Sequence, residues 1–123
     1  EYKIARLYEL LNNWKEALFY YTQSFVSDSR KADPLVRIAD YYWHQKQYDL
    51  CYMFALHATK ILYPEQLYTE KYLYDYTRYN LLSAAAWHVK DYEIGKWATI
   101  EALKAEPEAQ HLHDNLRLHS VKL

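Results

Sequence analysis

The chain has 123 residues and a net charge of −1, and aromatic residues make up 18% of it. This length fits one domain or part of one, and the near-zero charge predicts no general attraction to nucleic acid or to an anionic membrane. A single cysteine excludes an internal disulfide framework. No apolar run reaches the roughly 18 residues of a membrane span, and no signal-peptide pattern opens the chain. We expect a cytoplasmic location.

Helical periodicity runs through the whole chain. One glycine and three prolines also leave little to delimit strands or long loops. We expect seven helices, over residues 1–11, 14–27, 34–45, 48–61, 68–89, 92–105 and 109–120. Asn13 precedes the second helix as an N-cap. Asp33 and Pro34 open the third as its N-cap and first residue. Pro64 ends the fourth, and ten additional residues, 65–74, lengthen the fifth.

A fixed period relates three parts of the chain. Tyr8, Trp14 and Ala17 recur 34 residues later as Tyr42, Tyr48 and Cys51, and 44 residues beyond those as Ala86, Tyr92 and Gly95. A period of about 34 residues is that of the tetratricopeptide repeat (TPR), which the chain resembles. Small residues alternate with large ones in these positions, which lets two helices cross closely. The resemblance implies an all-α fold, a right-handed superhelical stack of helix-turn-helix (TPR-like) repeats with a C-terminal capping helix.

On this basis the chain is one TPR-like domain or a fragment of one. Its repeats cover about 1–30, 31–64 and 68–107, and its capping helix covers about 109–120. Leu112, Leu116 and His119 share one face of that last helix, which predicts that it covers the apolar edge of the third repeat. Glu1 aligns with the fourth position of its repeat, which is typical of a segment cut from a longer protein.

The sequence lacks the usual signatures of catalysis. No glycine-rich phosphate loop can form with one glycine, and neither His-Glu-x-x-His, Cys-x-x-Cys nor Gly-x-Ser-x-Gly occurs. His111 and His113 point about 200° apart on a helix, so they cannot chelate one metal ion. Cys51 shares with Ala17 and Gly95 a position that requires a small residue where two helices of a hairpin cross, which predicts a buried, unreactive thiol. We therefore assign no catalytic residue, metal ligand or cofactor to this chain.

One dipeptide, Trp-His, occupies equivalent places on two neighbouring helices. In TPR proteins the first helix of each pair lines a concave groove, and the resemblance places these dipeptides there. The candidates for a ligand groove are Trp43, His44, Trp87, His88, Arg6 and Asp40. Aromatic faces beside hydrogen-bonding and charged groups are suited to anchoring a peptide or stacking a sugar ring. The alternative is that the tryptophan rings pack between adjacent repeats, and the sequence leaves both interpretations open.

A further resemblance covers residues 30–105. The residues that carry it are Pro34-Leu35, Tyr63-Pro64, Tyr74-Asp75-Tyr76, Leu82-Ser83, Tyr92 and Gly95. This stretch resembles the TPR region that follows the catalytic domain in certain family 2 glycosyltransferases, including viral and bacterial ones. The resemblance implies that the sugar-nucleotide site and its acidic metal ligands lie upstream of these residues, so no catalytic residue is carried over to this chain.

Two functions remain open at this point. One is a non-catalytic TPR-like module that mediates protein or acceptor interactions as the C-terminal accessory part of a larger glycosyltransferase. The other is a stand-alone TPR scaffold that binds peptide partners in its concave groove and is unrelated to sugar transfer. The expected partner is a protein or peptide, an adjacent catalytic domain of the same chain, or a glycan acceptor. The residues do not decide whether the parent protein is an enzyme.

Overall fold

The computed structural model describes residues 1–65 and 69–123, and within them it contains helices and no strand. The helices are α1 (Tyr2–Leu10), α2 (Trp14–Ser27), α3 (Asp33–His44), α4 (Tyr48–Thr59), α5 (Arg78–Val89), α6 (Tyr92–Ala105) and α7 (Gln110–Val121), with a π-helical segment, η1 (Leu73–Thr77), leading into α5. Six of the seven agree with the expected ranges to within two residues. The fifth was expected from residue 68, which lies outside the described residues, and its helical backbone begins at Lys71.

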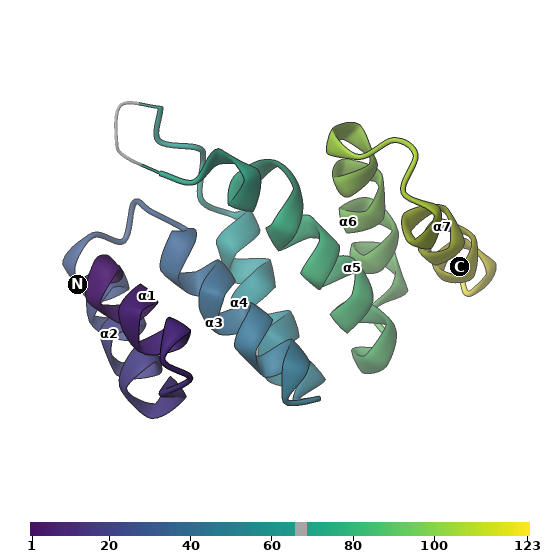
Figure 1. Cartoon of the computed structure of the whole chain (residues 1–123). Helices are drawn as coiled ribbons and strands as arrows, with labels where there is room; N and C mark the ends of the chain where they lie inside the picture. Colours follow the sequence, from purple (N-terminus) through teal and green to yellow (C-terminus); the bar gives the residue numbers. More distant parts are fainter. Residues whose placement is uncertain (66–68) are drawn as a thin grey trace.

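Consecutive helices form antiparallel hairpins that stack side by side (Figure 1). The hairpins are α1–α2, α3–α4 and α5–α6, and α7 lies against the last of them. The two ends of the chain lie at opposite ends of this stack (Figure 1). The expected fold class is therefore confirmed: the structure is an all-α, right-handed stack of TPR-like repeats with a helix covering its C-terminal end.

The turn of each hairpin has the same backbone geometry. Asn12, Lys46 and Lys90 have positive φ angles of 58°, 59° and 64°, and they stand 34 and 44 residues apart. A left-handed residue reverses the chain right after a helix, and asparagine tolerates that conformation better than lysine. The repeat is thus visible in the backbone, although Lys46 and Lys90 carry no sequence signal for this conformation.

Small residues lie where the hairpins cross. Ala17 and Cys51 have no exposed surface, and Gly95 is buried in α6. Burial raises the pKa of the Cys51 thiol to about 12, which agrees with the expected buried and unreactive cysteine. Close crossing of this kind allows the larger neighbours, such as Tyr21 and Leu82, to be fully buried beside the small ones.

Asp33 does not cap α3 as expected. Ala32 is the N-cap, and Asp33 is a buried residue in the first turn. Its carboxylate accepts hydrogen bonds from the Tyr74 hydroxyl at 2.6 Å and from the Glu70 backbone amide at 2.8 Å. The Tyr74 hydroxyl in turn accepts a bond from the Ala32 amide at 2.7 Å. The expectation was wrong because residues supplied by the inserted segment compete for this carboxylate and tie the insertion to the start of α3.

A second set of bonds ties the insertion to α1. The Tyr2 hydroxyl donates to the Glu70 carboxylate at 2.8 Å, and Arg37 donates to Glu70 at 2.7 Å and to the Tyr2 hydroxyl at 3.1 Å. Burial opposes ionisation of Glu70, but the hydrogen bonds from Arg37 and Tyr2 hold its pKa below the ordinary value. Glu70 therefore accepts both bonds as a carboxylate.

The final helix covers α6 and α5 with the face expected from the sequence. Leu112 and His119 are fully buried, and Leu116 is half-buried. The His119 ring lies over Gly95, at the place where a larger residue would carry its Cβ. Gly95 was expected to serve the crossing within its own hairpin, and the structure adds a tighter contact with α7.

Candidate functional site

A pocket of about 280 Å³ lies between the first helices of the second and third hairpins and the final helix. We call it the aromatic pocket; it is lined by Trp43 of α3, by Ala84, Trp87 and His88 of α5, and by His111, Asn115, Leu118 and His119 of α7. Helices α3 and α5 are the first helices of neighbouring hairpins, and α7 follows the last hairpin (Figure 1), so three successive parts of the stack supply the walls.

Trp43 and His88 form one side of the pocket and are held in place by α4. The His88 ring stacks on Tyr48 with centroids 3.7 Å apart and planes 9° apart. Trp43 contacts Tyr48 at 5.0 Å and His88 at 5.8 Å between centroids. His88 is exposed, so Tyr48 fixes one face of its imidazole and leaves the rest open to the pocket.

Trp87 also lines the pocket and is held by α6 and α7. Its ring makes edge contacts with Tyr92 at 5.4 Å and with His119 at 5.8 Å between centroids. The Lys122 ammonium lies 5.9 Å from the Trp87 and Tyr92 centroids. Both tryptophans are half-buried. The two interpretations of these residues therefore coexist, because each ring packs against a neighbouring element and also lines the pocket.

The hollow exists because Ala84 is small. Arg6, Asp40 and Ala84 are equivalent residues of the three hairpins, since they stand 34 and 44 residues apart. The first two carry long or charged side chains, whereas Ala84 leaves room between Trp43 and Trp87. The sequence does not indicate Ala84 as a site residue because alanine has no reactive or hydrogen-bonding side chain, although the repeat period marks its position.

The final helix forms the remaining wall with polar side chains that are bonded to α5 and η1. His111 Nε2 lies 2.8 Å from Asn80 Oδ1 and 3.2 Å from the Tyr76 hydroxyl. Asn115 donates to Ser83 Oγ at 3.2 Å. These contacts orient the wall before any ligand arrives. They were also missed from the sequence, which assigned this helix a capping role alone.

The other three candidate residues lie outside the aromatic pocket. His44 is largely exposed, and its Nδ1–H donates to the Asp40 backbone carbonyl at 2.9 Å. Asp40 is half-buried, and this burial raises the pKa of its carboxyl. Arg6 pairs with Glu9 at 2.9 Å. The structure thus groups Trp43, Trp87 and His88 of the proposed six residues and separates the rest.

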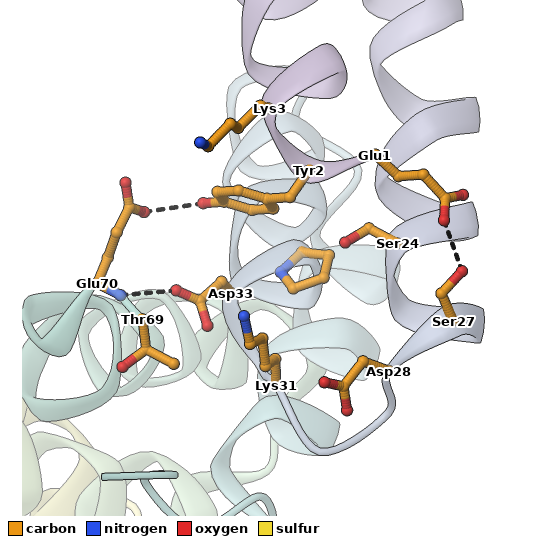
Figure 2. A pocket seen from close by; sticks show the side chains of 11 residues that line it. Glu1, Tyr2, Lys3, Ser24, Ser27, Asp28, Lys31, Asp33, Thr69 and Glu70 are labelled. Atoms are coloured by element: carbon orange, nitrogen blue, oxygen red, sulfur yellow. Dashed lines mark hydrogen bonds between the residues drawn. The ribbon is translucent and has the colours of Figure 1, made fainter. Parts of the chain in front are cut away.

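A larger cavity of about 400 Å³ lies at the other end of the stack, between the starts of α1 and α3, the end of α2 and residues Thr69 and Glu70 (Figure 2). Its carboxylates are already bonded. Glu1 accepts from Ser27 at 2.6 Å, Asp28 pairs with Arg30 at 2.9 Å, and Asp33 and Glu70 hold the insertion as described. We interpret this cavity as the joint between the first hairpin and the insertion.

The described part of the chain contains neither a cluster of metal-ligating side chains nor a membrane-spanning helix. No group of three histidine, cysteine, aspartate or glutamate side chains in residues 1–65 and 69–123 is placed to hold a metal ion. None of the helices described there is long and apolar enough to cross a membrane.

Comparison with known proteins places the fold among TPR domains. No protein-family model and no curated protein matches the sequence. Among solved structures, the chain is similar to the first TPR domain of Spaghetti (RPAP3) bound to the HSP90 peptide SRMEEVD, with a TM-score of 0.71 and 18% sequence identity. The match covers 97% of this chain and 89% of that chain. At this identity the likeness establishes the fold alone.

Proposed function

We propose that this chain is a non-catalytic interaction module that binds a peptide segment of a partner protein, with the aromatic pocket as its anchor site. The observation that carries the proposal is the convergence of α3, α5 and α7 on one pocket of about 280 Å³ at the place where the Trp-His dipeptide recurs. The peptide bound to the structurally similar TPR domain of Spaghetti supports the proposal by analogy.

The chemistry of the walls suits an extended peptide. Tryptophan rings offer large apolar faces at a small cost in conformational entropy, because each ring has only two rotatable bonds. The imidazole of His88 and the amide of Asn115 stand among these faces and can bond to the peptide backbone. Contacts with Tyr48 and Ser83 already orient both polar groups, so binding needs little further ordering.

A more specific role follows from the resemblance of residues 30–105 to the TPR region of family 2 glycosyltransferases. In that role the module is a C-terminal accessory part, located in the cytoplasm, that holds the adjacent catalytic domain or a glycan acceptor. The support for it is the resemblance alone. A stand-alone scaffold would use the same pocket, and the two roles differ in what occupies it.

Selection of random decapeptides displayed on phage, followed by titration calorimetry with the selected peptides, tests the proposal. We expect His88→Ala to weaken binding at least about fivefold, because an exposed pocket wall is removed without loss of core packing. His57→Ala is the matched control, since His57 is also exposed but lies on α4 outside the pocket. Both variants should keep the melting temperature of the parent chain.

Two outcomes would change the conclusion. Equal binding by the His88→Ala and His57→Ala variants would contradict the pocket as the peptide site. Binding of oligosaccharides in place of peptides, with the same sensitivity to His88→Ala, would favour the accessory role in sugar transfer.

A further inference from the structure

We infer that the aromatic pocket takes an uncharged aromatic side chain of the partner, and not an acidic residue or a terminal carboxylate. This inference rests on the proposed function and names the chemistry of the anchor. It depends on three properties of the described residues: the charge of the lining, the contacts that cations of the chain already make, and the volume of the pocket.

The lining carries no fixed charge. Among the described residues that form the pocket, none is lysine, arginine, aspartate or glutamate. A carboxylate moved from water into a partly enclosed site that offers imidazole and amide groups but no lysine or arginine loses part of its hydration without gaining an ion pair. An uncharged ring placed between Trp43 and Trp87 loses only apolar contact with water, which favours binding.

Arg6 of the first hairpin and Arg37 of the second already form ion pairs within the chain. Arg6 pairs with Glu9 at 2.9 Å, and Arg37 pairs with Glu70 at 2.7 Å. To pair with either arginine, an acidic ligand would have to displace the internal acid that the arginine already holds.

Lys122 places a cation against a residue of the lining. Its ammonium lies 5.9 Å from the centroids of Trp87 and Tyr92 and is not part of the lining. This position makes a cation–π contact that an incoming carboxylate would have to break. Lys122 therefore reinforces the orientation of Trp87 and does not convert the pocket into an acid site.

The size of the hollow matches a ring. A dry cavity of about 150 Å³ already holds benzene, and the aromatic pocket has about 280 Å³. Its lining includes Ala84, in the position that holds Arg6 and Asp40 in the other hairpins. A phenyl or indole group can therefore lie between Trp43 and Trp87 in the offset or edge-on contacts that aromatic rings prefer.

The test is a titration of the full chain with four acetylated and amidated pentapeptides, Gly-Ser-X-Ser-Gly, in which X is phenylalanine, leucine, alanine or glutamate. Binding is followed by the NMR shifts of the assigned indole N–H signals of Trp43 and Trp87. We expect saturable shifts with the phenylalanine peptide, at least tenfold weaker binding of the alanine and glutamate peptides, and intermediate binding of the leucine peptide. No saturable shift with the phenylalanine peptide up to about 10 mM would overturn the inference.

A filling variant supplies the control. Ala84→Leu adds bulk to the lining without removing any other lining side chain, and we expect it to weaken binding of the phenylalanine peptide at least tenfold. Ala105→Leu makes the same change at an exposed position at the end of α6 and should bind as the parent does. Equal loss in both variants would overturn the assignment of the pocket.

The peptides selected from the phage library separate this inference from the proposed function. Selected peptides that bind through the pocket, as judged by His88→Ala and Ala84→Leu, but lack an aromatic residue would overturn the aromatic anchor and leave the proposed function standing. Peptides that bind without sensitivity to either variant would overturn both.

Discussion

Replacing Gly95 with alanine should destabilise the protein, although alanine is the better helix former. A Cβ atom at this position would lie 2.2 Å from His119 Cε1 and 2.4 Å from Nδ1. The ring has little room to move, because His119 is 1% exposed and its Nε2–H donates to the Ser83 carbonyl at 2.9 Å. Alanine must therefore push the ring, and with it α7, away from α6.

The magnitude follows from opposing effects. Alanine in place of glycine within a helix stabilises by about 0.5–1 kcal/mol. Overpacking of a tight core contact costs about 1–3 kcal/mol, and loss of the buried bond from His119 to Ser83 costs about 1 kcal/mol more. The cost is larger, so we expect Gly95→Ala to lower the free energy of unfolding by about 1–3 kcal/mol.

A double-mutant cycle tests the cause. His119→Ala removes the ring, so Gly95→Ala in that background should regain the helix-propensity effect and stabilise by about 0.5–1 kcal/mol. Urea denaturation followed by circular dichroism measures all four proteins. The reasoning is refuted if Gly95→Ala stabilises the parent chain, or if it destabilises both backgrounds equally.

Three further predictions concern other parts of the structure. Cys51→Leu should lower the free energy of unfolding in urea by about 1–3 kcal/mol, because Cys51 has no exposed surface and the larger side chain overpacks the crossing. Burial raises the pKa of the Cys51 thiol to about 12, so alkylating reagents should label it only after urea unfolds the chain, and rapid labelling of the folded protein would contradict this. Glu70→Gln should reduce the loss of stability in acid. A carboxyl whose pKa is lowered on folding contributes stability at pH values above its ordinary pKa of about 4.3, and this contribution is lost as the pH falls through the pKa of the folded state. Equal acid denaturation of both proteins would contradict the bond to Arg37. Ending the chain at Glu108 should expose the apolar surface of the last hairpin against which Leu112 is buried. The melting temperature should then fall and light scattering should detect self-association. A monomer with an unchanged melting temperature would show that α7 is dispensable.

The sequence predicted the architecture well because the fold is made of local, repeated contacts. The positions of Ala17 and Cys51 report the hairpin crossings, and helix propensity agrees with the period throughout. Prediction failed where a contact joins distant residues. Asp33 has the sequence context of a helix cap, but Tyr74 and Glu70 bond to its carboxylate from about forty residues away, and local rules do not include that competition.

The candidate site was predicted only in part for a similar reason. The repeated Trp-His dipeptide indicated Trp43, Trp87 and His88, which share one pocket. Ala84 and the residues of α7 were missed because the hollow depends on a side chain that is small and on a helix that lies outside the repeat. Residue patterns in a sequence indicate the side chains that line a pocket more readily than they indicate the space between those side chains.

The bonds around Glu70 have a consequence for how this array unfolds. In an ordinary solenoid each repeat touches only its neighbours, so stability is close to a sum of repeats and interfaces along one dimension. Here Tyr2 of the first hairpin bonds to Glu70, 68 residues away in the segment that precedes the third helical pair. Loss of the first hairpin therefore removes one of the bonds to Glu70, while Asp33 and Arg37 of α3 still hold the segment. Native-state hydrogen exchange should show lower protection of residues 70–77 when α1 opens. A one-dimensional description of this chain needs a coupling term between its first and third repeats.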